Sequence, residues 1–336
     1  MMRTVILSIV LLFPVIASHG QDIHFSQFNR SPMNLNPGLA GQFDGDYRLV
    51  ANHRNQWRSV TKPYNTTGGS VDARQPLDLK NLGAGASIYT DKAGDSQLST
   101  LQLNLAVSYL KHISNDSLHS ISVGLQTGLT HRKINYEDLS FDEQYQNGIY
   151  NPNLGTGESF VRDSRTYLNL NLGAAWYYKM TSRKEISAGI ALHNINRPKQ
   201  SFYNDPEIKL DMRWTVHANA EWKVAEKIDV IPSILFMYQG PHREFTLGTL
   251  GRYRLKDFPG IYRAVFLGWH GRTRDAGYLT AGLEYDNWRV GMSYDFNMSQ
   301  LNVASNARGG FEISAIYLFR TEKQRRIIHK ICPDYL

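Results

Sequence analysis

The chain has 336 residues, of which 42% are hydrophobic and 20% charged, and its formal net charge is +7. The one long apolar run stands at the very start, which excludes a protein of several membrane-spanning helices. A content of 19 Tyr, 14 Phe and 27 Gly excludes a disordered chain. The single cysteine, Cys332, cannot form an intramolecular disulfide, so the fold needs another source of stability, such as a large closed sheet.

Residues 1–20 have the pattern of a secretory signal peptide. Arg3 precedes an apolar run over residues 5–17, and small residues follow at Ser18 and Gly20. The run is short for a membrane-spanning helix, so cleavage before Gln21 is expected rather than an N-terminal anchor. No cysteine stands at the expected cleavage point, which argues against a lipoprotein. The mature protein is therefore predicted to be exported.

The rest of the chain alternates between apolar and polar residues with a period of two. Leu101, Leu103 and Leu105, for example, are separated by Gln102 and Asn104. Such alternation predicts β-strands with two chemically different faces. About fourteen segments show it, and each is long enough to cross a membrane as a tilted strand: they are 47–60, 65–76, 82–91, 98–112, 119–133, 166–179, 185–196, 210–223, 228–239, 244–256, 262–272, 276–285, 287–298 and 310–320.

The two faces of these segments indicate a membrane barrel more than a soluble sandwich. The polar face is rich in Gly, Ser, Asn and Gln and suits a crowded lumen, and it carries Arg48, Arg54, Arg58, Arg74, Arg213, Arg252, Arg254 and Arg289. The apolar face has aromatic residues toward segment ends, as in interfacial girdles: Trp57, Tyr109, Trp176, Tyr178, Trp214, Trp222, Trp288 and Phe319. We predict an all-β fold, an antiparallel outer-membrane barrel of about 14 strands over residues 46–320. A soluble all-β protein is the alternative.

The connections between the segments support the same fold. Those after the second, fourth and later even-numbered segments are short, whereas the others include the long stretches 134–164, 197–209 and 299–309. Short periplasmic turns and long outer loops are typical of outer-membrane barrels. The chain then divides into the signal peptide, a periplasmic N-terminal segment over 21–45, the barrel, and a basic periplasmic tail over 321–336.

Two segments are candidates for partner contacts. The stretch 134–164 has six carboxylates against Arg162 alone, a net charge of −5, and is either a surface segment or a plug of the basic lumen. The tail has a net charge of +2 and could bind a protein or an anionic surface. Either segment is equally well explained as a solvated loop or terminus. Nucleic acid is not a sensible partner for an exported barrel.

The sequence contains no convincing catalytic or metal site. No His-Glu-x-x-His, Gly-x-Ser-x-Gly or phosphate-loop pattern is present. His193 with Asn194 and Asn196 could be imagined at a barrel rim, but polar packing explains them better. We therefore predict a protein that is not an enzyme and that holds no cofactor or metal.

The N-terminal part of the sequence carries several motifs in a distinctive order: Phe25-Ser26-Gln27-Phe28, Pro32, the run Asn36-Pro37-Gly38-Leu39-Ala40-Gly41, and Arg54-Asn55-Gln56-Trp57. Together they resemble the start of the PorP/SprF family of type IX secretion and gliding proteins of Bacteroidetes. Weaker elements follow in the family's order, at Gly83-Ala84-Gly85, at residues 193–198, at Ser293-Tyr294-Asp295-Phe296 and at Ile331-Cys332-Pro333. Gly38 and His53 depart from the residues common in the family, and so does the ending Asp334-Tyr335-Leu336.

The resemblance implies an integral outer-membrane barrel that works with the type IX secretion apparatus. Its partners would be outer-membrane lipid and either secretion components, such as the periplasmic ring or a peptidoglycan-binding lipoprotein, or one large surface adhesin. We place partner contacts on segment 22–45, the tail and the long loops, with motif candidates Phe25, Ser26, Gln27, Asn36, Pro37, Gly41, Asn55, Gln56 and Trp57. Segment 34–41 is expected to pack against or into the periplasmic mouth. The alternative function is a porin or substrate-selective channel, with arginines lining an anion-favouring pore.

Overall fold

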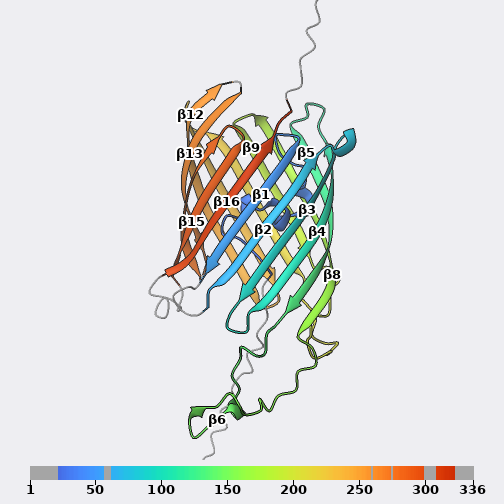
Figure 1. The fold of residues 1–336 in the computed structure, drawn as a ribbon. Helices are drawn as coiled ribbons and strands as arrows, with labels where there is room; N and C mark the ends of the chain where they lie inside the picture. The colour runs from blue at the N-terminus through green and yellow to red at the C-terminus, as the bar shows by residue number, and fades with distance from the viewer. Residues whose placement is uncertain (1–21, 57–61, 259, 274, 299–307, 322–336) are drawn as a thin grey trace, which may run out of the picture.

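The computed structural model describes residues 22–56, 62–258, 260–273, 275–298 and 308–321. Fourteen antiparallel strands close into one barrel (Figure 1). The predicted fold class is therefore confirmed. The strands are β1 (Tyr47–Gln56), β2 (Tyr64–Arg74), β3 (Leu82–Ala93), β4 (Leu98–His112), β5 (His119–Lys133), β8 (Ser164–Thr181), β9 (Lys184–His193), β10 (Arg213–Lys223), β11 (Ile228–Gln239), β12 (His242–Phe258), β13 (Ile261–Arg272), β14 (Ala276–Tyr285), β15 (Trp288–Asn297) and β16 (Arg308–Phe319).

Each strand pairs with its neighbours in sequence, and β1 pairs with β16 to close the sheet. The predicted segments match these strands to within a few residues. The segment predicted over 185–196 ends earlier, at His193, because Asn194 has a φ of 57° and turns the chain. Residues 57–60 of the first predicted segment lie outside the described residues, and with them Trp57 and Arg58.

The two faces of the barrel wall are separated as the alternation predicted. In β5, Ser122 and Gln126 are buried inside, whereas Val123 and Leu125 are about half exposed on the outer surface. Outward aromatic residues gather near both strand ends, as a membrane interface favours. They include Tyr47, Tyr109, Trp222, Tyr253, Tyr285, Trp288 and Phe319 at one end and Trp214, Tyr238, Trp269, Phe296 and Phe311 at the other.

The two ends of the barrel differ in the length of their connections. We call one end the turn end; its connections are 75–81, 113–118, 182–183, 224–227, 259–260 and 286–287. The other is the loop end, which includes the long connections 134–163 and 194–212. Among the residues that the structure describes, no helix has both the length and the apolar character needed to cross a bilayer.

The longest connection forms an arm, residues 134–163, that stands away from the barrel (Figure 1). It contains η4 (Asp142–Gln144) and a small hairpin of β6 (Tyr145–Gln146) and β7 (Ile149–Tyr150). Tyr136 stacks on Phe160 with their ring centroids 3.9 Å apart. Of the two predicted forms of this acidic segment, the structure therefore shows the surface segment and not a plug.

The lipid-facing surface can be tested by placing a charge at two depths. Leu125→Arg, in the middle of β5, is expected to lower the free energy of unfolding by about 2–4 kcal/mol, because a charge at the bilayer midplane is poorly solvated. Leu101→Arg, close to the loop end of β4, is the matched control and should cost at most about 1 kcal/mol. Urea unfolding in lipid vesicles, followed by tryptophan fluorescence, measures both; equal costs would contradict this placement of the membrane.

Candidate functional site

The lumen of the barrel is filled by residues 22–45, which we call the plug (Figure 1). At the loop end, the Asp22 N–H donates to Gln239 Oε1 at 3.0 Å, and Asn194 Nδ2 donates to Asp22 Oδ2 at 2.6 Å. At the turn end, the chain leaves the lumen where the Asp46 N–H donates to the Phe319 carbonyl at 2.8 Å. The plug therefore passes along the lumen from one end to the other.

Three short helical turns make the plug compact. They are η1 (Phe28–Arg30), α1 (Pro32–Leu35) and η2 (Pro37–Leu39). Pro32 and Pro37 occupy the first positions of their helices, where the missing N–H costs nothing. Asn36 caps the last turn by accepting a bond from the Gly38 N–H at 2.8 Å. The prolines and Asn36 thus explain why this segment turns tightly instead of continuing as a strand.

Ser26 and Gln27 form the first anchor of the plug. Their N–H groups donate to the two carboxylate oxygens of Glu312 at 2.7 and 3.0 Å. The Ser26 hydroxyl lies 2.9–3.0 Å from both oxygens of Asp295, and Tyr278 donates to the Ser26 carbonyl at 2.7 Å. Hydrogen bonds to buried carboxylates are among the strongest in proteins. Strands β14, β15 and β16 therefore hold this dipeptide directly.

Two arginines neutralise the carboxylates behind this anchor. Arg54 of β1 is 1% exposed, and its guanidinium lies 3.1 Å from Asp295 and 4.0 Å from Glu312. Arg54 also donates to the His24 carbonyl of the plug at 3.0 Å. Arg272 of β13 lies 3.6 Å from Asp295 and donates to the Ser26 hydroxyl at 2.8 Å. Burying these charges is tolerable only because each has both a counter-charge and hydrogen bonds.

Asn36 forms the second anchor, against the opposite wall. Its Nδ2 donates to the Ala174 carbonyl of β8 at 3.0 Å and to the Ile190 carbonyl of β9 at 3.3 Å. The backbone can come so close because the wall carries inward glycines there. A Cβ on Gly124 would lie 2.6 Å from the Gly38 nitrogen, which is nearer than real atoms approach. The glycines of this groove are Gly83, Gly124, Gly173 and Gly189.

The third anchor lies nearer the turn end. The Gly41 N–H donates to Asp72 Oδ2 at 2.7 Å, and Gly41 has a φ of 70°, which favours glycine. Arg48 binds both oxygens of Asp72, at 2.9 and 2.6 Å, and donates to the Leu39 carbonyl at 3.0 Å. This fork geometry fixes the plug backbone to β1 and β2 together.

Apolar contacts fill the space between the anchors. Phe28 and Leu35 of the plug pack on Leu235 of β11, and Phe25 lies 6.3 Å from Tyr89 between ring centroids. Near the turn end, Phe43 packs on an inward apolar cluster of Val50, Ile316 and Leu318. The interior is therefore a packed core built between the plug and the wall.

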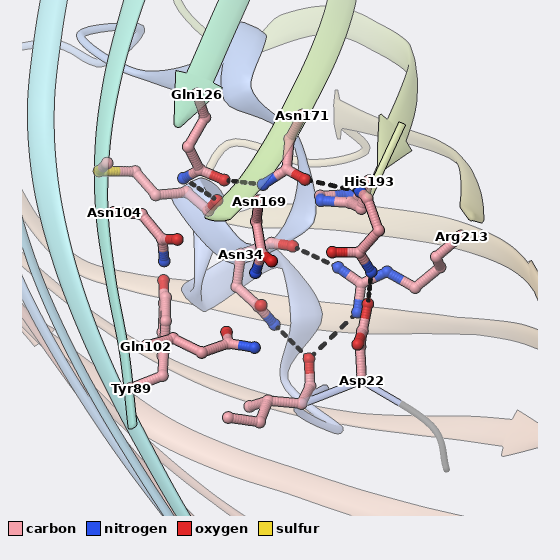
Figure 2. A pocket seen from close by; sticks show the side chains of 13 residues that line it. Asp22, Asn34, Tyr89, Gln102, Asn104, Gln126, Asn169, Asn171, His193 and Arg213 are labelled. Carbon is pink, nitrogen blue, oxygen red and sulfur yellow. Dashed lines mark hydrogen bonds between the residues drawn. The ribbon is translucent and has the colours of Figure 1, made fainter. Parts of the chain in front are cut away.

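A narrow crevice remains between the plug and the inner faces of β4, β5 and β8 (Figure 2). Asn171 Nδ2 donates to Gln126 Oε1 at 2.7 Å, and Gln126 Nε2 donates to the Met33 carbonyl of the plug at 3.2 Å. Asn169 Oδ1 is buried there and has no partner among the described residues. This polar space suits an ordered water. On this side the wall holds the plug by uncharged contacts, in contrast to the charged anchor on β13–β16.

A second charged cluster lies inside the turn end, beside the plug. Asp229 of β11 is fully buried and accepts bonds from Arg183 at 2.6 Å, Arg252 at 2.9 Å and Arg254 at 2.6 Å. Glu221 also pairs with Arg252 and with Arg254. The predicted luminal arginines Arg252 and Arg254 are thus neutralised by carboxylates, which the alternation alone did not reveal.

Arg30 of the plug binds the barrel wall through its side chain. Its guanidinium lies 4.5 Å from the centre of the Phe266 ring and donates to the Arg289 carbonyl at 3.4 Å. Within the described ranges, no three His, Cys, Asp or Glu side chains gather as metal ligands.

The structure brings together most of the motif residues that the sequence singled out. Phe25, Ser26, Gln27, Asn36, Pro37 and Gly41 all lie in the plug, and their contacts are with the barrel wall. Asn55 and Gln56 lie apart from the plug, at the loop end of β1, where Asn55 Nδ2 donates to Asn65 Oδ1 at 2.6 Å. Trp57 lies outside the described residues. Sequence reasoning did not predict that the wall residues Asp72, Tyr278, Asp295 and Glu312 bind this motif, although Asp295 stands in one of the weaker family elements.

The closed strands, apolar outer surface and filled polar lumen define an outer-membrane-type β-barrel with an internal plug. The family model described as "Type IX secretion system membrane protein PorP/SprF" matches residues 17–317. The chain therefore belongs to the PorP/SprF family. The predicted family is confirmed, and membership supports an outer-membrane location.

Solved structures agree on the fold. The toluene transporter TbuX of Ralstonia pickettii is 11% identical, with a TM-score of 0.52 over 87% of this chain and 94% of that one. The monoaromatic hydrocarbon channel CymD is 10% identical, with a TM-score of 0.50 over 88% and 94%. Identities this low show the fold alone. No curated protein matches the sequence.

The glycine groove makes a steric prediction about the plug. Gly124→Ala should displace residues 36–41, because the new methyl group would overlap plug backbone that cannot rotate away. The expected result is more frequent ion-conducting openings in planar lipid bilayers. Gly69→Ala is the matched control, since a Cβ there lies 3.7 Å from its nearest neighbour. Identical conductance in the two variants would contradict the groove's role.

The charged anchor makes an energetic prediction. Glu312→Gln removes one buried partner of Arg54 and should lower the free energy of unfolding by about 3 kcal/mol or more. Asp163→Asn breaks the pair with Lys133, in which both side chains are more than half exposed, and should change stability little. Urea unfolding of both variants in lipid vesicles gives the comparison. A Glu312→Gln variant as stable as the wild type would show that this carboxylate does not secure the plug.

Proposed function

We propose that the protein is a non-enzymatic outer-membrane barrel of the type IX secretion machinery that docks secretion components or a surface adhesin. Membership of the PorP/SprF family supports the machinery. The observation that carries a docking role, rather than a conducting one, is the plug: three separate anchors hold it along the whole lumen. A barrel whose interior is packed in this way offers its ends, not its lumen, to other molecules.

In this proposal the loop end faces the cell exterior, because long loops are typical of that side. The arm is the main docking surface there. Its hairpin exposes Tyr145, Ile149 and Tyr150, and its net charge of −5 over residues 134–163 favours a partner with basic residues. The connection 194–212 lies at the same end. The tail 321–336 is proposed as a periplasmic contact.

A porin or selective channel is the alternative function. An anion-favouring pore would need free luminal arginines, yet Arg48, Arg54, Arg252, Arg254 and Arg272 each lie within 4 Å of a carboxylate. Arg213 is instead occupied by the plug, because it donates to the carbonyls of Ile23 and Asn34. The plug would also have to leave. These contacts favour docking over passive conduction.

The deciding experiment is a pull-down of the C-terminally tagged protein from detergent-solubilised outer membranes, with mass spectrometry of its partners. A variant with residues 137–160 replaced by a Gly-Ser turn is tested in parallel. We expect the wild type to capture a giant surface adhesin or a type IX ring component, and the arm variant to capture at least about tenfold less. That difference corresponds to about 1.4 kcal/mol of binding free energy.

Controls separate folding from docking. The arm variant must keep the heat-dependent gel migration of a folded barrel. Gly69→Ala, which changes only the outer wall, must capture partners as the wild type does. Recovery of the barrel alone, together with steady conductance of the wild type in a planar bilayer, would overturn the docking proposal and favour the channel.

A further inference from the structure

The turn between β2 and β3 exposes aliphatic side chains beyond the strands. Leu77 is 91% exposed and Leu79 is 52% exposed. Ile113, on the turn between β4 and β5, is 53% exposed. These two turns are neighbours because β3 and β4 pair along their whole length. Leu77, Leu79 and Ile113 form what we call the aliphatic patch, and apolar groups gathered in this way usually have an apolar neighbour.

The backbone of the same turn is strained. Gln75, Leu77, Asp78 and Asn81 all have φ between 53° and 66°, a conformation that residues with a Cβ adopt at an energetic cost. The turn is also longer than a hairpin connection requires, since Asp286 and Asn287 alone connect β14 to β15. The extra residues of 75–81 include the exposed Leu77 and Leu79.

The turn is continuous with the lipid-facing surface of the barrel. Figure 1 shows it standing out to the side of the wall at the turn end, not along the barrel axis. The outward residues next to it, Tyr47, Val71 and Tyr109, are all about half exposed and belong to the apolar belt and its girdle. Tyr47 pairs with Ala73, and Tyr109 with Leu82, at the bases of the turn.

Two lysines lie beside the aliphatic patch. Lys80 follows Leu79, and Lys111 lies two residues before Ile113. Neither lysine has a carboxylate within 4 Å in the part of the chain that the structure describes. Lysine side chains beside apolar residues at a membrane interface extend toward lipid phosphates. The acidic residues of the two turns are Asp78 and Asp116.

We propose that turn 75–81 is a lipid-binding site: the aliphatic patch inserts into the lipid leaflet at the turn end, and Lys80 and Lys111 bind anionic phosphate headgroups. The lateral position and the continuity with the girdle favour lipid over a soluble protein. The site would fix the height and tilt of β2–β5 in the membrane. This inference depends on the barrel fold and not on the docking proposal.

Spin-label accessibility tests the insertion. Leu77→Cys is made in a Cys332→Ser background, labelled with a nitroxide, and reconstituted in phosphatidylcholine vesicles with or without phosphatidylglycerol. We expect strong relaxation by oxygen and weak relaxation by an aqueous nickel chelate. Glu226→Cys, on the exposed turn between β10 and β11, is the matched control and should show the reverse. If the nickel chelate relaxes the label on Leu77→Cys as strongly as the label on this control, the proposal is overturned.

Lipid retention tests the headgroup contacts. The double variant Lys80→Ala and Lys111→Ala should retain severalfold less phosphatidylglycerol in native mass spectrometry than the wild type, whereas Lys227→Ala, on another turn, should not. Equal retention would overturn the headgroup assignment. If Leu77→Cys is shielded from nickel in native outer membranes but not in pure lipid vesicles, a protein and not lipid covers the patch, which also overturns the proposal.

Discussion

The structure depends on one constraint: in lipid, every backbone N–H and C=O must be bonded within the protein. Pairing of β1 with β16 meets it by leaving no sheet edge. Closure places apolar side chains outside and polar ones inside, and fourteen strands enclose more space than their own inward side chains fill. The plug fills that space. The packed, polar interior of the barrel is thus a consequence of closing the sheet in a membrane.

The plug is bound differently on its two sides, and the difference follows from the wall chemistry. On β16, the buried Glu312 carboxylate accepts from the N–H groups of Ser26 and Gln27, and Arg54 of β1 neutralises Glu312 and Asp295. On β3–β9, glycines and carboxamides admit the plug backbone without charge. Buried charge pairs are costly to separate, whereas uncharged contacts exchange readily with water. Any partial opening of the lumen would therefore begin along the crevice beside β4, β5 and β8.

Strand positions were predictable because alternation is a local property of the sequence. The segment predicted over 228–239 is a strand although it contains a proline: Pro232 lies inside β11, where the ladder to β10 is interrupted between the pairs Asn219–Ser233 and Trp222–Val230. The location of residues 22–45 was harder to predict from the sequence. The turn chemistry of segment 34–41 predicts packing against or into the periplasmic mouth, but nothing local says that Glu312, almost 300 positions away, bonds Ser26. Such pairings are set by barrel closure, which places β16 beside β1.

The glycines on the inner face illustrate how one composition can have two causes. Read from the sequence, Gly among Ser, Asn and Gln indicates a polar lumen, which an open pore and a plugged barrel share. In the structure, Pro37 and Asn36 lie against Gly124 and Gly173, which leaves no space for a side chain at these two positions. The requirement for glycine there is therefore steric. The motif around Asn36 and these distant glycines therefore form one complementary set. A chain that kept the polar face but lost either half of this set would fold a similar barrel with a different interior.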